Sequence, residues 1–136
     1  LAPLASPGNQ PKILAAPVVV IIGHDLEFYE HLVKNFAHNP NARAVFEGKE
    51  AMIQGTAFRN GTLQGAYLMI AARSLGLDCG PMGGFNRAGV DQEFFLSDPT
   101  MKSWRSSFLC NIGHGDDTRL RPRAPRLDFD EACRIL

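Results

Sequence analysis

The chain is organised around the segment Gly76-Leu77-Asp78-Cys79-Gly80-Pro81-Met82-Gly83-Gly84-Phe85. It follows a long apolar segment, residues 51–75, whose only charged side chains are Arg59 and Arg73. Such a segment predicts a helix that is buried on more than one side. Gly76 is placed to end this helix in the left-handed conformation, and the following leucine can supply the apolar contact that usually accompanies such an end.

Glycine and proline dominate the second half of this stretch. Four of the six residues from Gly80 to Phe85 are Gly or Pro, which predicts a backbone that is sharply bent or closely approached by another group. At Gly83-Gly84 two successive peptide N–H groups are free of side chains and can reach a flat ligand. An ordinary glycine-rich loop between a helix and the next element is the alternative interpretation.

Length, charge and cysteine content limit the class of protein. The 136 residues suffice for one domain with a core. The 14 Lys and Arg balance the 14 Asp and Glu, and a net charge of zero does not attract nucleic acid or an anionic membrane. Three widely spaced cysteines, Cys79, Cys110 and Cys133, match neither a zinc site nor a disulfide framework, which favours a reducing, cytoplasmic location. Asn60 and Gln64 interrupt the apolar helix and argue against a membrane span.

A β-branched run marks the first predicted strand. Residues 18–22 are all Val or Ile and end at Gly23, the pattern of a strand covered on both faces at the centre of a sheet. Asp25 is placed to cap a helix over residues 26–36. His24, Asp25 and Glu27 are a possible metal cluster, but a helix cap with solvated neighbours is the commoner use of this spacing, so we predict no metal site.

Glycines within the long helix predict close packing. Gly61 and Gly65 lie one turn apart on one face, and each costs about 1 kcal/mol of helix propensity relative to Ala. We therefore expect a second helix to cross there at short range. Because the helix is apolar nearly all round, we also expect a homodimer with this helix at the interface.

The remainder of the chain predicts a short helix, a second strand and a basic tail. Val90 and Phe94-Phe95 indicate the helix, and residues 106–113 alternate as a strand. The adjacent acidic pair Asp116-Asp117 is weak as a catalytic pair because neighbouring residues on a turn point apart. No other side chain is a convincing acid, base or nucleophile, so we predict no catalytic residue.

Arginines cluster in the tail, residues 119–126. Its two prolines keep the backbone extended, so Arg121 and Arg123 are expected to project to the same side. Two guanidinium groups on one side suit a phosphate, although a solvated basic tail fits equally well. Beyond it, Asp128 and Glu131 match a capping box that begins a last short helix through Leu136.

Taken together and in this order along the chain, these sequence segments resemble the flavin-dependent nitroreductase family. The resemblance rests on residues 75–85, 111–115 and 121–126 and covers essentially the whole chain. Further details resemble the malonic semialdehyde (3-oxopropionate) reductase branch of that family: Ala57-Phe58-Arg59-Asn60, Gly80-Pro81-Met82, Phe94-Phe95 and residues 125–133.

The resemblance implies an α+β homodimer that binds FMN at the subunit interface. It also implies ping-pong hydride transfer from NAD(P)H to a small aldehyde, such as malonic semialdehyde, or to a nitroaromatic. The positions it assigns to the flavin ring are Pro81, Met82, Gly83 and Gly84, and those it assigns to the FMN phosphate are Arg121 and Arg123. The cofactor would then supply the chemistry that no side chain here offers.

Two departures from the family pattern qualify this expectation. Several nitroreductases carry an acidic residue where this chain has Gly83. Family members also have a further helical subdomain before the strand that follows Pro17, so we expect residues 1–136 to be the C-terminal portion of a single FMN-binding domain. The alternative functions are a non-catalytic flavin or nucleotide binder, including an inactive truncated form, and a structural or interaction module with solvated arginines.

Overall fold

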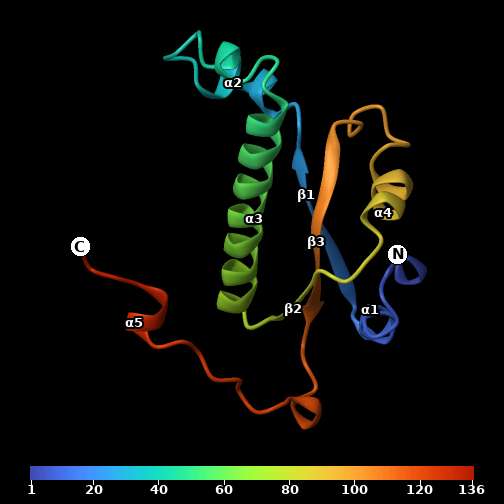
Figure 1. Ribbon diagram of the computed structural model, residues 1–136. Helices are drawn as coiled ribbons and strands as arrows, with labels where there is room; N and C mark the ends of the chain where they lie inside the picture. The colour runs from blue at the N-terminus through green and yellow to red at the C-terminus, as the bar shows by residue number, and fades with distance from the viewer.

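The computed structural model describes residues 1–136 as a small antiparallel sheet flanked by helices (Figure 1). The helices and strands are α1 (Gln10–Ala15), β1 (Val18–Asp25), α2 (Leu32–Asn35), α3 (Glu50–Ser74), β2 (Asp78–Met82), α4 (Arg87–Phe94), β3 (Trp104–Gly113) and α5 (Phe129–Ala132). Short 3-10 turns lie at Ala2–Leu4, Phe28–His31, Arg43–Val45 and Asp117–Arg119. None of the helices has the length and apolar content needed to cross a bilayer.

The sheet has the order β1-β3-β2, with both pairs antiparallel. Helix α3 covers one face, while α4 and the N-terminal segment with α1 lie on the other (Figure 1). The fully buried side chains Leu109 and Cys110 belong to β3, so the core forms around that strand. The predicted second strand is confirmed as β3, and it occupies the centre of the sheet, a position that the sequence had not assigned to it.

The predicted central position of residues 18–22 is wrong. β1 is an edge strand, and Val18 is 53% exposed. A run of β-branched residues reflects apolar contacts on the faces of a strand, whereas its place in the sheet depends on which strands hydrogen-bond to it. Those partners come from residues far along the chain, which a local pattern does not report.

Helix α3 ends as predicted, but its burial differs. Gly76 has φ of 78°, and the N–H of Leu77 donates to the Ala72 carbonyl at 3.1 Å, which is the expected glycine-dependent end. The buried residues of α3 are small and face the sheet: Ala57, Gly61, Gly65 and Ala72. Within this chain the helix is therefore buried on one side, not on several.

Gly61 and Gly65 of α3 contact the sheet, so the predicted crossing helix is wrong. A Cβ atom at Gly61 would lie 3.0 Å from His24 Cβ and 3.1 Å from the Gly23 carbonyl oxygen. A Cβ atom at Gly65 would lie 2.6 Å from the Phe108 ring. The missing side chains let α3 lie directly on β1 and β3.

Residues 26–36 do not form the single helix that was predicted. They divide into the 3-10 turn at Phe28–His31 and the one-turn helix α2, and neither contains a buried residue. Asp25 does accept a hydrogen bond from the Glu27 N–H at 2.8 Å. The segment stands off the end of the sheet (Figure 1), so its apolar face has no core surface that would stabilise a longer helix.

The elements near the C-terminus follow the prediction in part. The short helix is confirmed as α4, whose cap Asn86 accepts from the Gly89 N–H at 3.1 Å. The capping box of Asp128 and Glu131 is present, but α5 stops at Ala132 instead of continuing to Leu136. Strand β2 extends through Gly80-Pro81 to Met82, so the non-regular backbone begins only at Gly83.

Candidate functional site

The loop after β2 presents two unpaired backbone amides. Met82 is buried at the end of the strand, whereas Pro81, Gly83 and Gly84 are exposed. Neither glycine N–H donates a hydrogen bond within the chain. A Cβ atom on Gly83 would meet nothing within 4 Å. The loop therefore offers two accessible donors beside open space, which suits an acceptor atom on an external molecule.

Gly84, in contrast, lacks space for a side chain because the N-terminal segment packs against it. Its carbonyl accepts hydrogen bonds from the Ser6 N–H at 3.0 Å and from Asn9 Nδ2 at 3.2 Å. A Cβ atom on Gly84 would lie 2.8 Å from Ser6 Oγ. The close approach predicted for the glycine pair is thus confirmed at Gly84, but the approaching group is the N-terminal segment of the same chain.

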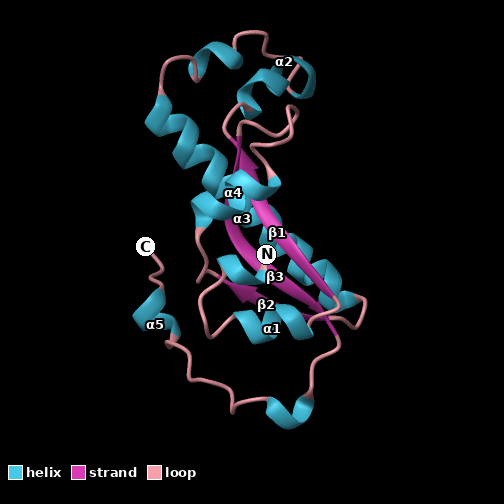
Figure 2. Cartoon of the chain, turned by 90° about the vertical axis from the view of Figure 1, so that its right-hand side faces the viewer, coloured by secondary structure: helices cyan, strands magenta, loops and turns pink.

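Arg121 and Arg123 lie in the exposed tail after β3. Neither guanidinium has an ion-pair or hydrogen-bond partner in the chain. The tail extends away from the sheet in both views (Figures 1 and 2). The single chain therefore does not bring these arginines beside Gly83, and their shared role at a phosphate stays a prediction.

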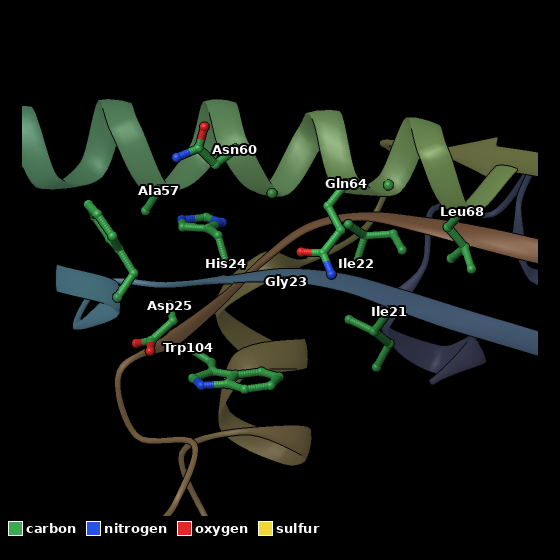
Figure 3. Close-up of a pocket in the computed structure, with 13 residues that line it drawn as sticks. Ile21, Ile22, Gly23, His24, Asp25, Ala57, Asn60, Gln64, Leu68 and Trp104 are labelled. Atoms are coloured by element: carbon green, nitrogen blue, oxygen red, sulfur yellow. The ribbon is translucent and has the colours of Figure 1, made fainter. Parts of the chain in front are cut away.

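A cavity that the sequence did not reveal lies along α3 and β1, with Ile21 and Trp104 on the side of β1 away from α3 (Figure 3). Its volume is about 400 Å³. Polar side chains in it include His24, Asn60 and Gln64; the other lining residues are Ile21, Ile22, Gly23, Asp25, Phe28, Ala57, Gly61, Gly65, Leu68 and Trp104. The sequence contains one feature that could have indicated this cavity: Asn60 and Gln64 carry amides one turn apart on a largely apolar helix.

His24 is fixed in this cavity by its neighbours. Its Nδ1 atom lies 2.8 Å from Ser107 Oγ, and the Phe58 ring meets it edge-on at 5.7 Å between centroids. Burial lowers the pKa of His24, and the Asp91 carboxylate opposes this effect. Asp25 bonds instead to Ser103 Oγ at 2.6 Å, and the chain brings no three His, Cys, Asp or Glu side chains together as a metal site.

One carboxylate is buried against the sheet and accepts a hydrogen bond from the backbone of β3. Asp91 on α4 is 8% exposed, and its Oδ1 accepts from the Ser106 N–H at 2.7 Å. This part of β3 extends past the end of β2, so the carboxylate satisfies a backbone donor that would otherwise lack a partner. The hydroxyl of Ser106 is also buried, and it has no hydrogen-bond partner in the chain.

Comparison with known proteins gives a consistent result. The model of the family described as "Nitroreductase family" matches residues 3–114. A relative from Cupriavidus pinatubonensis, named as a candidate NADH dehydrogenase/NAD(P)H nitroreductase, is 53% identical over 99% of this chain and 68% of its own length. A relative from Ralstonia pickettii with the same type of name has the same identity and coverage.

Solved structures share the fold. A candidate nitroreductase from Bacillus subtilis has a TM-score of 0.86 at 20% identity, covering 100% of this chain and 70% of that one. A candidate nitroreductase from Exiguobacterium sibiricum, solved in complex with FMN, has a TM-score of 0.77 at 19% identity, with the same coverage. These matches confirm the predicted α+β, nitroreductase-like fold. The chain belongs to the nitroreductase family.

Proposed function

We propose that the chain forms part of an FMN-dependent NAD(P)H oxidoreductase. Its substrate would be a small aldehyde, such as malonic semialdehyde, or a nitroaromatic. The names of its relatives support the NAD(P)H-dependent class, and a structural neighbour was solved with FMN. The finer choice of malonic semialdehyde rests on the sequence resemblance alone.

The observation that carries this proposal is the pair of free, exposed amides at Gly83 and Gly84. A flavin ring presents acceptor atoms along one edge, and the open space beside Gly83 leaves room for it. When bound, FMN would take up a hydride from NAD(P)H and deliver it to the substrate. Backbone donors at this place would stabilise negative charge on the group that they face.

We assign the FMN phosphate to Arg121 and Arg123. Both guanidinium groups are exposed and unpaired, so binding a phosphate would not require an existing ion pair to break. The tail would have to fold toward a flavin held by this chain or by a second copy, because it leaves the sheet in the single chain (Figure 2).

The proposed assembly is a homodimer through α3. Large apolar side chains on its outward surface are exposed, among them Leu63 at 55%, Tyr67 at 73% and Ile70 at 65%. A contiguous apolar surface on a long helix is typical of an interface. We further propose that residues 1–136 are the C-terminal portion of one FMN-binding domain; the cytoplasmic location stays a prediction.

The ring contact is tested by Gly83→Val, with Gly8→Val as the control. Neither position has atoms within 4 Å of an added Cβ, so both variants should fold. We expect the valine at position 83 to crowd the ring and weaken FMN binding at least tenfold, measured by flavin fluorescence on apoprotein, while Gly8→Val binds normally. Unchanged binding in Gly83→Val would count against the contact.

The phosphate contact is tested by Arg123→Ala, with Arg134→Ala as the control. A charge-assisted hydrogen bond contributes about 1.5–3 kcal/mol, so FMN affinity should fall about tenfold or more. Riboflavin, which lacks the phosphate, should lose little. Equal losses for FMN and riboflavin would contradict the assignment.

A second candidate function is a flavin binder without turnover. Both functions predict a yellow protein. Bleaching by NAD(P)H followed by reoxidation with 3-oxopropionate or a nitroaromatic would identify the oxidoreductase, and comparison of these acceptors would identify the substrate class. A yellow protein that NAD(P)H does not bleach would support the binder.

A further inference from the structure

The loop proposed to contact the flavin is attached at both of its ends. On one side, Met82 is the last residue of β2, which pairs with the central strand β3. On the other side, Phe85 forms an isolated antiparallel bridge with Ala5 of the N-terminal segment. Gly83 and Gly84 therefore span a short gap between two residues that the rest of the chain holds in place.

The N-terminal segment holds this loop at the Gly84 carbonyl. That oxygen accepts hydrogen bonds from the Ser6 N–H at 3.0 Å and from Asn9 Nδ2 at 3.2 Å. A Cβ atom on Gly84 would lie 2.8 Å from Ser6 Oγ and 3.0 Å from Asn9 Nδ2, so the two segments are in direct contact. Two donors at one carbonyl fix the orientation of the peptide group that follows the glycine pair.

Asn9 makes this long-range contact in place of a local one. It immediately precedes α1, where the side-chain oxygen of an asparagine normally accepts a hydrogen bond from a backbone N–H of its own helix. No such cap forms here. Its Oδ1 accepts from Lys12 Nζ at 3.4 Å, and its Nδ2 donates to a carbonyl 75 residues away in the sequence. The side chain connects α1 to the loop instead of stabilising the start of the helix.

The backbone of Asn9 is itself held on both sides. Its N–H donates to the Ser6 carbonyl at 2.8 Å, and its carbonyl accepts from the Ile13 N–H at 3.0 Å. Ala5 and Ile13, which lie on either side of it in the sequence, both belong to the buried core cluster. The Asn9 amide therefore reaches Gly84 from a part of the chain that is anchored in the core.

We propose that Asn9 is a positioning residue for the flavin loop. Its hydrogen bond to the Gly84 carbonyl holds the Gly83 and Gly84 N–H groups in the orientation in which they face the ring; this role rests on the proposed flavin contact at that loop. Glycine loses more conformational freedom on ordering than any other residue, so a loop that is ordered in advance binds its ligand more tightly. Fixed donors also stabilise negative charge without having to reorient.

The first test measures the loop without flavin, in the full-length apoprotein, and compares Asn9→Ala with Gln10→Ala. Gln10 is the matched control because its Nε2 donates to the Ala5 carbonyl at 3.0 Å, within the same segment. In Asn9→Ala the NMR order parameters of the Gly83 and Gly84 amides should fall from about 0.85, typical of a rigid backbone, toward about 0.6. Unchanged order parameters, or an equal fall in Gln10→Ala, would overturn the proposal.

Asn9→Asp separates the hydrogen bond from packing. The carboxylate has nearly the size of the amide, but when ionised it only accepts hydrogen bonds, so it cannot donate to the Gly84 carbonyl. Asn9→Asp should therefore loosen the loop at least as much as Asn9→Ala does. A loop that stays ordered in Asn9→Asp would show that the hydrogen bond is not what holds it.

The second test measures flavin binding in the same variants. Because the loop is proposed to face the ring, Asn9→Ala should weaken FMN and riboflavin by the same factor, about three- to tenfold, as expected for the loss of one hydrogen bond. The reduction potential of the bound flavin should become more negative, because the donors that stabilise added negative charge are no longer fixed. Gln10→Ala should change neither quantity. A loss confined to FMN, or an unchanged potential, would overturn the positioning role.

Together the two tests distinguish the role of Asn9 from the proposed function. A wild-type protein that binds no flavin, with a loop that loosens in Asn9→Ala, would refute the flavin contact while supporting the contact between Asn9 and the loop. Equal FMN affinity and equal loop order in wild type and Asn9→Ala would overturn the positioning role and leave the proposed oxidoreductase function intact.

Discussion

The change Gly65→Ala tests the contact that positions α3 on the sheet. The added Cβ would lie 2.6 Å from Phe108 Cζ and 3.1 Å from Ile22 Cγ2. Carbon atoms normally pack at about 3.5–4.0 Å, so the Phe108 ring or the helix must move. Overpacking of this kind costs about 1–3 kcal/mol.

The matched control is Gly55→Ala on the same helix. An added Cβ there meets nothing within 4 Å. Both substitutions gain about 1 kcal/mol of helix propensity, so this term cancels between them. Gly55→Ala should stabilise the protein, and the difference between the two variants should equal the packing cost of about 1–3 kcal/mol.

Thermal and urea unfolding at equal protein concentration measure this difference. For a chain of this size, 1 kcal/mol corresponds to about 3–4 °C in Tm, so Gly65→Ala should unfold about 3–12 °C below Gly55→Ala. A Phe108→Leu background should reduce the gap, because it removes part of the ring that clashes. Equal Tm values for the two alanine variants would contradict the predicted clash between the added Cβ and the Phe108 ring.

Three further predictions concern the buried carboxylate, the cavity histidine and the outer face of α3. Asp91→Ala should lower the free energy of unfolding by about 1–3 kcal/mol because the buried Ser106 N–H loses its acceptor, while Asp91→Asn, which keeps an oxygen, should lose less in urea titrations. Burial lowers the pKa of His24, so the unfolded chain binds a proton first as the pH falls below about 6.5. Stability should therefore decline below that pH and level off below the lowered pKa, and a His24→Asn variant with the same slope would contradict this. Ile70→Asp should convert a dimer to monomers in light scattering, because Ile70 is 65% exposed in the single chain; an unchanged dimer would exclude this face as the interface.

Local sequence patterns predicted only part of the candidate site. The bare pair Gly83-Gly84 is visible in the sequence, but only the structure shows that Gly83 faces open space while Gly84 accommodates Ser6 and Asn9. The cavity was missed because its polar groups, His24, Asn60 and Gln64, come from two elements. Their convergence depends on how closely α3 lies on β1, which no single segment encodes.

Features that depend on a few neighbouring residues could be predicted from the amino-acid sequence. The left-handed glycine at Gly76, the capping box of Asp128 and Glu131, and the apolar content of α3 act through the local backbone and side chains. The order of motifs along the chain was also sufficient for the family and its α+β fold.

The central strand, the groups that cover Gly61 and Gly65, and the position of the cavity all depend on long-range packing. β1 became an edge strand because β3, far along the chain, pairs with both other strands. Gly65 meets Phe108 instead of a helix for the same reason. These outcomes depend on contacts between distant residues, whose geometry is fixed only when the hydrophobic surfaces of all elements are buried together.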